Sequence, residues 1–472
     1  MNYIIQQFMN TLNDDLKNII SQLSSNPRLL SSLEEVIPMK LNDLISSSLI
    51  SLVKKLDDDF ANSDFRKNNY TIIAFKERTV VMNFDTITFK RRYYKNISSG
   101  KYYFYIDDML SLLPRQRVSH KVCADILSQL STGRCSYAQA ASKFGLSKNF
   151  TYNLLKSIST DTDIPDKPKD ILCEYLYFQA DEEHIHLQHK GKRAPRKKDG
   201  SKIPNCYELK EVTVFTGREW QNSNRYQLQN KTHFVPFEDE SNEDFTNRIY
   251  EYVQRNYTVT GKQESYLYGD GASYIKTMAD QLGCEFILDR FHFQQALTRL
   301  TGGRKHKDVR QLMSYYASTN QKEEFAYVGR LHIGLEQRLG DFYQKQLAYL
   351  LNNWEFYQHN FTLPNQTGSS AEGMNSHYYA SYFSSRPKGF SKANIHKIGT
   401  LISLKESHID ISEYYLNHLY EMNHKVKAYY QSETYQHKIK KVTSYEQYNN
   451  IPVMNHHATA GIRKTMRMIA YG

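Results

Sequence analysis

The sequence predicts an α/β multidomain protein, and three observations support this fold class. The chain has 472 residues, too many for one compact core, because domains usually run to ~100–200 residues. Its composition is 40% hydrophobic, enough to fill buried cores. Strand-like and helical runs alternate between residues 174 and 288. We therefore expect several modules, one of them an α/β core.

The charge balance favours a polyanionic partner. The net charge is +11 and the isoelectric point is about 9.0, and a basic surface attracts nucleic acid through Coulomb forces and counterion release. A membrane surface and simple solubility are the alternatives. No stretch approaches the ~18 consecutive apolar residues of a membrane span, so we expect no membrane association.

Five scattered cysteines without a C-x-x-C pair argue against disulfide frameworks and thiolate zinc sites. Asn13, Asp14 and Asp15 occupy the place of a signal peptide's apolar segment. These features predict a cytoplasmic protein.

The first half of the chain divides into three predicted segments. Residues 1–66 have apolar side chains at helical spacing, and residues 67–113 contain the strand-like runs 71–75, 78–84, 87–94 and 102–106, which predict a small antiparallel sheet. Residues 114–165 are again helical. The last segment ends in a loop rich in Asp, Pro and Lys, where we place a domain boundary.

A helix-turn-helix is predicted within residues 136–158. Ala141 is small enough for two helices to cross, Gly145 permits the positive φ of the turn, and Ser147 suits the N-cap of the second helix. That helix would present its first turns to a DNA major groove. The alternative is an ordinary helical hairpin. The candidate DNA-binding side chains are Lys148, Asn149, Thr151 and Tyr152.

The remaining segments form the predicted core. Strands are expected at 174–188, 207–215, 226–237, 265–268 and 285–288, with helices at 240–255 and 274–282. The first part of the core spans 168–289, a helical insertion spans 290–365, and residues 366–472 complete the core and add C-terminal helices.

Three acidic residues in this region are candidate catalytic groups. Asp181 shares the inward face of a strand with Ile185, where a carboxylate needs a cation or hydrogen bonds. Asp270 follows a strand, where ligands gather in open α/β sheets. Glu372 begins a helix whose dipole favours its ionised form. Each has a plain structural alternative: a solvated strand edge for Asp181, an Asp-Gly turn for Asp270, and an S-x-x-E capping box for Glu372.

Together the three acids predict more than each alone. Enzymes that cleave phosphodiesters with two metals need several carboxylates around Mg²⁺ or Mn²⁺, and these hard cations prefer oxygen ligands. A ribonuclease-H-like sheet places its first and fourth strands side by side, which would bring Asp181 and Asp270 together. We therefore predict Mg²⁺ (or Mn²⁺) bound by Asp181, Asp270 and Glu372.

Four blocks, ADEEHIHLQ, YGDGASYIK, LDRFHF and SSAEG…SSRPKGFS, resemble those of the ISLre-type bacterial insertion-sequence transposases of the DDE superfamily. The resemblance covers roughly residues 70–430. It implies Asp181, Asp270 and Glu372 as the DDE triad on a ribonuclease-H-like fold, with Glu336 and Glu355 as alternative third acids. Asp289 and His292 also resemble the D-x-x-H signature of related Mutator-like transposases, and on a helix both would lie on one face and support the site. The alternative is an N-cap Asp and a surface His.

Two further clusters have functional and plain interpretations. His184 and His186 could bind zinc, but they lie on the strand face opposite Asp181, which favours an outward polar face. A basic run beside the predicted core could hold DNA phosphates or form a solvated loop. Its candidate DNA-binding residues are Lys192, Arg193, Arg196, Lys197 and Lys198.

The sequence thus predicts a Mg²⁺-dependent DNA transposase that hydrolyses phosphodiesters and transfers strands at the ends of a mobile element. Its expected partners are double-stranded DNA, as inverted-repeat ends and target, and further copies of itself on the bacterial nucleoid. A tyrosine recombinase and a non-catalytic DNA-binding regulator derived from a transposase are the alternatives.

Overall fold

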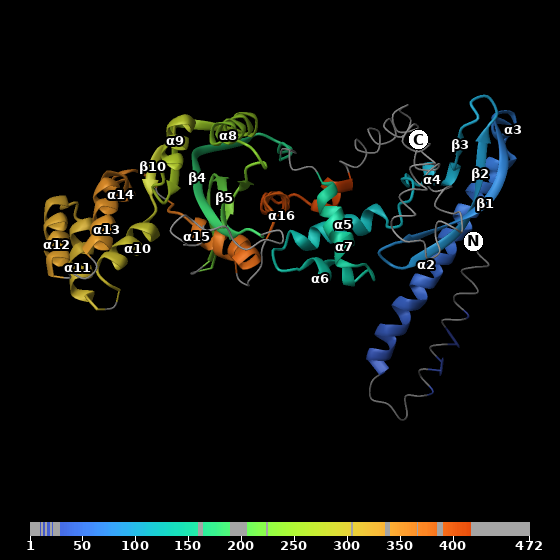
Figure 1. Cartoon of the computed structure of the whole chain (residues 1–472), viewed down its shortest axis with the longest axis horizontal. Helices are drawn as coiled ribbons and strands as arrows, with labels where there is room; N and C mark the ends of the chain where they lie inside the picture. The colour runs from blue at the N-terminus through green and yellow to red at the C-terminus, as the bar shows by residue number, and fades with distance from the viewer. Residues whose placement is uncertain are drawn as a thin grey trace, which may run out of the picture. The chain divides into compact units, whose positions relative to one another are not determined.

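The structure, a computed structural model, describes residues 29–158, 164–188, 205–222, 225–303, 305–335, 340–365, 367–384 and 390–416, with a few isolated positions before residue 29 (Figure 1). The chain forms two compact units. The first comprises Met1–Val122 with Glu413–Gly472, and the second comprises Cys123–Ser412. The predicted division into six segments is finer than this and stays a prediction.

In its described residues, the first unit contains a long helix and a small antiparallel sheet, as predicted. Its elements are α2 (Leu29–Asn62), α3 (Asp64–Asn69), β1 (Tyr70–Val81), β2 (Thr86–Asn96), β3 (Tyr102–Tyr103) and α4 (Tyr105–Met109), with sheet order β1-β2-β3. The runs 71–75 and 78–84 form one strand instead of two, because Lys76 and Glu77 between them carry no turn signal. The run 102–106 is a strand for only two residues before α4 begins.

The helix α2 is joined to β2 by a buried carboxylate. Asp57 is 2% exposed and accepts hydrogen bonds from the Arg92 main-chain N–H (3.0 Å) and from its guanidinium (3.1 Å). Val53, one turn earlier, is buried in the core of this unit with Val80 and Phe89. One side of α2 is therefore fixed on the sheet by an ion pair and by apolar packing.

Part of α2, Glu34–Asn62, is long and apolar enough to cross a membrane by length and composition. Only 11% of its most apolar 18-residue window is buried. The same helix places Val53 and Asp57 in the interior of the first unit, a role that needs no membrane.

The second unit is built on a mixed five-stranded sheet. Its strands are β4 (Ile171–His186), β5 (Cys206–Phe215), β8 (Thr232–Phe234), β9 (Tyr257–Gly269) and β10 (Glu285–Leu288), in the order β10-β9-β4-β5-β8. β4, β5 and β8 pair antiparallel, while β4, β9 and β10 pair parallel. The predicted adjacency of the first and fourth strands is confirmed by the β4–β9 pair.

For the strands of the five-stranded sheet, the order of three strands, helix, strand, helix and strand is also confirmed, with α8 (Asn242–Asn256) and α9 (Ser273–Leu282) in the expected places. One predicted strand, 226–237, is wrong in extent. It is divided at Asn230, whose φ of 52° interrupts the extended backbone. The residues before it form β7 (Arg225–Gln229), which pairs with β6 (Gly217–Asn222) in a separate hairpin, and those after it form β8.

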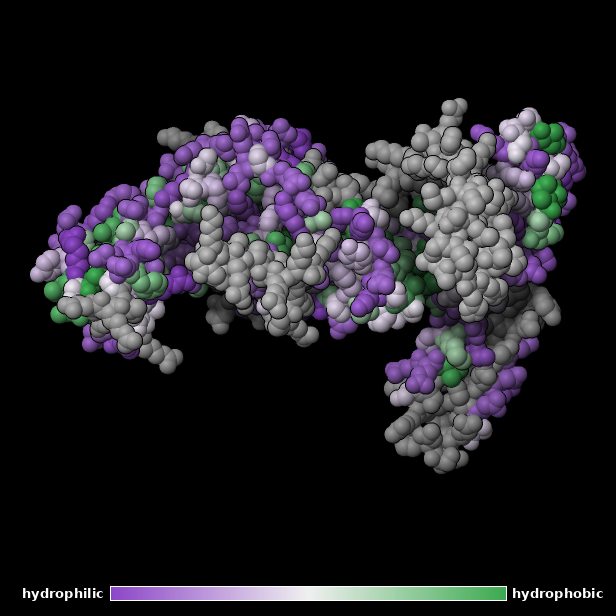
Figure 2. Space-filling view, in the orientation of Figure 1, coloured by the Kyte–Doolittle hydropathy of each residue, from purple (hydrophilic) through white to green (hydrophobic). Residues whose placement is uncertain are grey.

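The two faces of the sheet have different chemistry. Phe178 and Ala180 of β4 and Val212 of β5 point into a core with α8 and α9, whose outer surface is hydrophilic (Figure 2). Because successive strand residues point to opposite faces, Gln179 and Asp181 lie on the other face. That face is covered by α15 (Ala371–Met374) and by the π-helix η3 (Asn375–Ser384).

Residues 290–360 are helical, as predicted. They form α10 (Arg290–Leu300), α11 (Lys307–Ser318), α12 (Lys322–Leu335), α13 (Gly340–Asn352) and α14 (Trp354–Thr362). These helices share a core of their own around Phe293, Leu350 and Trp354. Their core also includes Leu288 of β10, which attaches them to the edge of the sheet. The remaining helices are α5 (His120–Leu130), α6 (Tyr137–Ser142), α7 (Lys148–Ser157) and α16 (Lys392–Glu406).

We predict that Gly271→Ala destabilises the protein by about 2–3 kcal/mol, since it adds a steric conflict to an unfavourable backbone conformation. Gly271 has φ +89°, and a Cβ there would lie 2.7 Å from Oδ1 of the buried Asn353. Gly283, with φ +67° and open space around it, is the matched control, and Gly283→Ala should cost about 1 kcal/mol. Chemical denaturation would measure both, and equal losses would contradict the steric argument.

Candidate active site

Asp181 lies in the middle of β4 with its carboxylate buried. Its residue is 6% exposed, and its two oxygens accept hydrogen bonds from the Glu182 main-chain N–H (2.8 Å) and from Asn375 Nδ2 (3.3 Å). The alternative of a solvated strand edge is therefore wrong. Two hydrogen bonds do not replace full hydration of a carboxylate, so this group is suited to a further positive partner.

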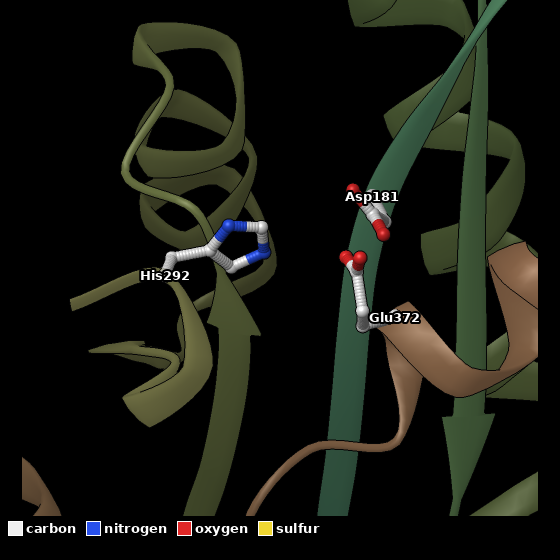
Figure 3. A group of neighbouring side chains, drawn as sticks. All are labelled: Asp181, His292 and Glu372. Atoms are coloured by element: carbon white, nitrogen blue, oxygen red, sulfur yellow. The ribbon is translucent and has the colours of Figure 1, made fainter. Parts of the chain in front are cut away.

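Glu372 faces Asp181 from the first turn of α15 (Figure 3). The alternative interpretation of Glu372, an S-x-x-E capping box, is not found in the described residues. Ser370, rather than Ser369, occupies the N-cap position and makes no side-chain cap bond there. The Glu372 carboxylate is directed toward Asp181 instead of toward its own helix terminus.

Asp289 and His292 have different tasks. Asp289 caps α10, since its carboxylate accepts from the Phe291 N–H at 2.9 Å, so the N-cap alternative is right for Asp289. His292 lies one turn later and points toward the two acids (Figure 3). His292, although partly exposed, is grouped with Asp181 and Glu372, and Asp289 fixes the start of the helix that carries His292.

Asp181, His292 and Glu372 form a group that could hold a metal ion. One ligand atom from each lies within 4.8 Å of the others. Asp270 lines the same cavity of ≈ 470 Å³, but its carboxylate is not part of that group and accepts from the Ala272 N–H at 2.8 Å. The three predicted acids thus share one cavity, and His292, not Asp270, is grouped with the other two at ligand distance.

The pairing of the strands explains why Asp270 is near Asp181. Tyr268 is the register partner of Gln179 in the parallel β4–β9 pair. Two residues further along each chain, Asp270 leaves β9 at the level where Asp181 lies in β4. The Tyr349 hydroxyl donates to the main-chain oxygen of Asp270 at 2.5 Å and fixes this turn against α13.

Burial dominates the electrostatics of the site. It raises the pKa of Asp181 to about 6, with Glu372 adding to the effect, while the Glu182 N–H, His292 and Asn375 oppose it. Burial first, and then the charges of Glu208 and Asp270, raise the pKa of Glu182. A bound cation would reduce the electrostatic repulsion between these neighbouring carboxylates.

Two functional residues were missed from the sequence. Asn375 donates both to Asp181 and to the Glu182 carbonyl (3.2 Å), and its buried Oδ1 has no hydrogen-bond partner. Glu211 is the cross-strand partner of Asp181 and is 4% exposed; burial, and then the charge of Asp181, raise its pKa well above the usual range. The alternation of Glu211 and Thr213 with the apolar residues of β5 was the available signal for an inward acid.

These donors are compatible with a divalent cation. Asp181 and Glu372 offer oxygen, His292 offers nitrogen, and the unpartnered Asn375 Oδ1 lies next to them. Carboxylates suit Mg²⁺ and Mn²⁺, and an imidazole is also a ligand of later transition metals. The residues are therefore compatible with a divalent metal ion.

The zinc site considered for His184 and His186 is only partly matched in the structure. His184 is grouped with Glu182 and Glu208 at ligand distance, and His184 and Glu208 are exposed. His186 does not belong to this group. Exposed acidic groups are common without a metal, so the favoured interpretation of an outward polar face stands for His186.

The predicted DNA-reading helix is α7, which pairs with α6 across a turn at Gly145 with φ +64°. Lys148, Asn149 and Tyr152 are exposed on it. The prediction that Thr151 contacts DNA is wrong. Thr151 is fully buried and its hydroxyl donates to the Tyr137 carbonyl at 3.1 Å, so it cannot reach DNA.

Several other predicted residues lie elsewhere. Glu355 is outside the cavity, on α14, where it pairs with Lys322 at 3.3 Å and is 73% exposed, so it is excluded as third acid. Glu336 lies outside the described residues. The same holds for the basic run of Lys192, Arg193, Arg196, Lys197 and Lys198.

Residues 23–412 match a family described as "Uncharacterised protein family (UPF0236)". The chain belongs to the UPF0236 family. A UPF0236 protein of Caldanaerobacter subterraneus subsp. tengcongensis, whose name joins eleven loci, is 23% identical over 99% of this chain and 97% of its own length. Another from the same organism is 24% identical over 99% of this chain and 92% of its own.

A chain of the Drosophila P element transposase strand transfer complex is similar in structure with a TM-score of 0.24 and 12% identity. The match covers 61% of this UPF0236 chain and 79% of that chain.

We predict that Asp181→Asn stabilises this UPF0236 protein near pH 7 in the absence of added metal. Folding raises the pKa of Asp181 from 3.8 to about 6, so its contribution to stability is complete below about pH 4 and is lost as the pH rises through 6. Asparagine carries no charge and avoids this loss, which is about 1–3 kcal/mol at neutral pH. Denaturant unfolding at pH 4 and pH 7 would measure it.

The matched control is Asp280→Asn, which removes an exposed carboxylate on α9. It should leave the pH dependence of unfolding unchanged. A variant Asp181→Asn with the same pH dependence as the wild type would contradict the raised pKa.

Proposed function

We propose that this UPF0236 protein is a DDE-type DNA transposase. It uses a divalent metal to hydrolyse phosphodiesters and to transfer strands at the ends of a mobile element. The observation that carries the proposal is the meeting of Asp181, Asp270, Glu372 and His292 in one cavity, although they lie far apart in the sequence. Converging carboxylates beside a sheet are what metal-dependent phosphoryl transfer needs.

The sheet supports this reading of the cavity. Three antiparallel strands followed by two parallel ones, with the first strand central, is the arrangement of a ribonuclease-H-like core. The first acid lies on the central strand β4 and the second directly after the adjacent parallel strand β9. A third acid arrives from a helix after the sheet, and the helices α10 to α14 form an insertion before it.

The residues around the cavity have distinct roles in the proposed reaction. Asp181, Glu372 and His292 would hold the cation, and Asp270 lines the same cavity. A bound cation would supply an activated water and neutralise charge on the phosphate. Asn375 orients the Asp181 carboxylate, and Arg299, on the face of α10 that lines the cavity, attracts the DNA backbone.

The number of copies in a relative supports the mobile-element role. One UPF0236 protein has a name that joins eleven loci of a single genome. A gene whose product moves its own DNA accumulates in this way. The proposed substrates are therefore the inverted-repeat ends of the element and its target DNA.

The exposed Lys148, Asn149 and Tyr152 support α7 as the DNA-reading helix of a helix-turn-helix. The basic run 192–198 holds phosphates, and two or more copies of the chain act together on DNA in the cytoplasm. A net charge of +11 supports this partner.

We predict that the protein cleaves duplex DNA carrying its element ends in the presence of Mg²⁺ or Mn²⁺. Asp181→Asn, Asp270→Asn and Glu372→Gln should each lower the rate by about 100-fold or more, because each removes charge that stabilises the transition state. The measurement is single-turnover cleavage of a labelled duplex whose sequence comes from the DNA flanking the gene.

Glu355→Gln is the control for loss of a carboxylate outside the cavity and should cleave at the wild-type rate. DNA binding without any metal-dependent cleavage by the wild type would identify a non-catalytic regulator. Cleavage that survives Asp181→Asn in a folded protein would refute the proposed site.

A further inference from the structure

A cavity of ≈ 830 Å³ in the first unit is lined with arginine side chains. Arg78 comes from β1, Arg91 from β2, and Arg115 and Arg117 from the segment after α4. Among the described residues that line it, Glu77 is the single acid. We call this cavity the four-arginine pocket.

A carboxylate behind the pocket neutralises only part of its charge. Asp107 lies 2.7 Å from Arg91 Nε and 3.9 Å from Arg78 Nη1, so one carboxylate serves two guanidinium groups. Glu77 is exposed and lies 3.9 Å from Lys90, so its negative charge is partly neutralised by that lysine. Positive charge therefore remains in excess in the pocket.

The two inner arginines are held in place by other groups of the protein. Arg91 Nη1 donates to the Lys76 and Glu77 carbonyls (3.3 and 3.2 Å), and its guanidinium lies 4.0 Å from the Phe104 ring. Arg78 Nη2 donates to the Leu113 carbonyl at 2.7 Å, but its buried Nε has no acceptor. The inner pair therefore contributes fixed positive charge to the wall of the pocket.

The two outer arginines lie on a segment whose backbone is fixed. Arg115 has φ +62°, an uncommon conformation for a residue with a side chain. The Gln116 side chain accepts from the Leu113 N–H (2.9 Å) and donates to the Val118 carbonyl (2.8 Å), and the Val81 N–H donates to the Arg117 carbonyl (2.8 Å). Both arginines are exposed, and neither has a carboxylate partner within the described part of the chain.

We propose that the four-arginine pocket binds a phosphate group of a nucleic-acid backbone. Guanidinium groups match phosphate oxygens in a planar, two-pronged geometry, and burial of two of them strengthens the attraction. The exposed outer pair contacts the phosphate oxygens, and the buried inner pair adds positive charge behind them. That the polyanion is DNA rests on the proposed function; the anion chemistry rests on the pocket alone.

The test compares two double variants of the full-length protein. Arg115→Gln with Arg117→Gln removes the outer pair. Lys54→Gln with Lys55→Gln removes two exposed charges from α2 in the same unit and is the matched control. Affinity for a labelled duplex is measured by fluorescence anisotropy in EDTA over a range of salt concentrations, and thermal unfolding verifies that both variants fold.

The arginine variant should bind about 10-fold more weakly at 0.1 M salt, and its slope of log K against log salt should fall by about 2, one for each lost phosphate contact. The lysine variant should change less than about twofold, because its charges touch no phosphate. Equal affinities and slopes in the two variants would overturn the proposal.

A second arm identifies the source of the phosphate. Inorganic phosphate is added against chloride of equal ionic strength. If phosphate displaces DNA no better than chloride, the pocket recognises a backbone; if it displaces DNA strongly from the wild type and not from the arginine variant, a free anion is the ligand and the backbone assignment is wrong.

Failure of this proposal differs from failure of the proposed function. A protein that binds DNA through the pocket but never cleaves it loses the transposase assignment and keeps the pocket. A protein that cleaves DNA while the arginine and lysine variants bind alike loses only the pocket.

Discussion

The burial of one carboxylate in the middle of a sheet is the constraint on which the second unit depends. Asp181 is removed from water by the helices that cover β4, and its cross-strand neighbour Glu211 is buried as well. Two acids side by side in a protein interior are unfavourable unless one stays protonated or a cation approaches. The surrounding elements place polar groups around the Asp181 carboxylate. Asn375 and the Glu182 N–H donate hydrogen bonds to it, and His292 faces it.

The residues that meet this carboxylate come from separate elements that the fold joins around it. β9 brings Asp270 to the level of Asp181, α10 brings His292, and α15 brings Glu372. Strand pairing fixes the first of these positions and an N-cap fixes the second. The site is therefore a property of the whole sheet and its insertion, not of a local motif.

The sequence was informative wherever a pattern is local. The strand 285–288 has its predicted limits, α9 begins within one residue of its predicted start, and Asp289 caps its helix. Sequence periodicity did not predict the end of a strand at Asn230, because the positive φ of that one residue ends it. It also did not predict the burial of Thr151, because a neighbouring helix covers that residue. Glu211 needed the three-dimensional pairing of strands, because its local sequence does not show which acid it approaches. The D-x-x-H resemblance pointed to His292, but only the fold shows that it faces Asp181 and Glu372.

The helices α10 to α14 interrupt the chain between β10 and α15, and they are part of the site. α10 carries His292, and Tyr349 of α13 holds the turn at Asp270. The last acid, Glu372, follows all of them in the chain. A nascent polypeptide that has not yet emerged from the ribosome beyond this point lacks Glu372, so synthesis must pass the insertion before the group of Asp181, His292 and Glu372 can form.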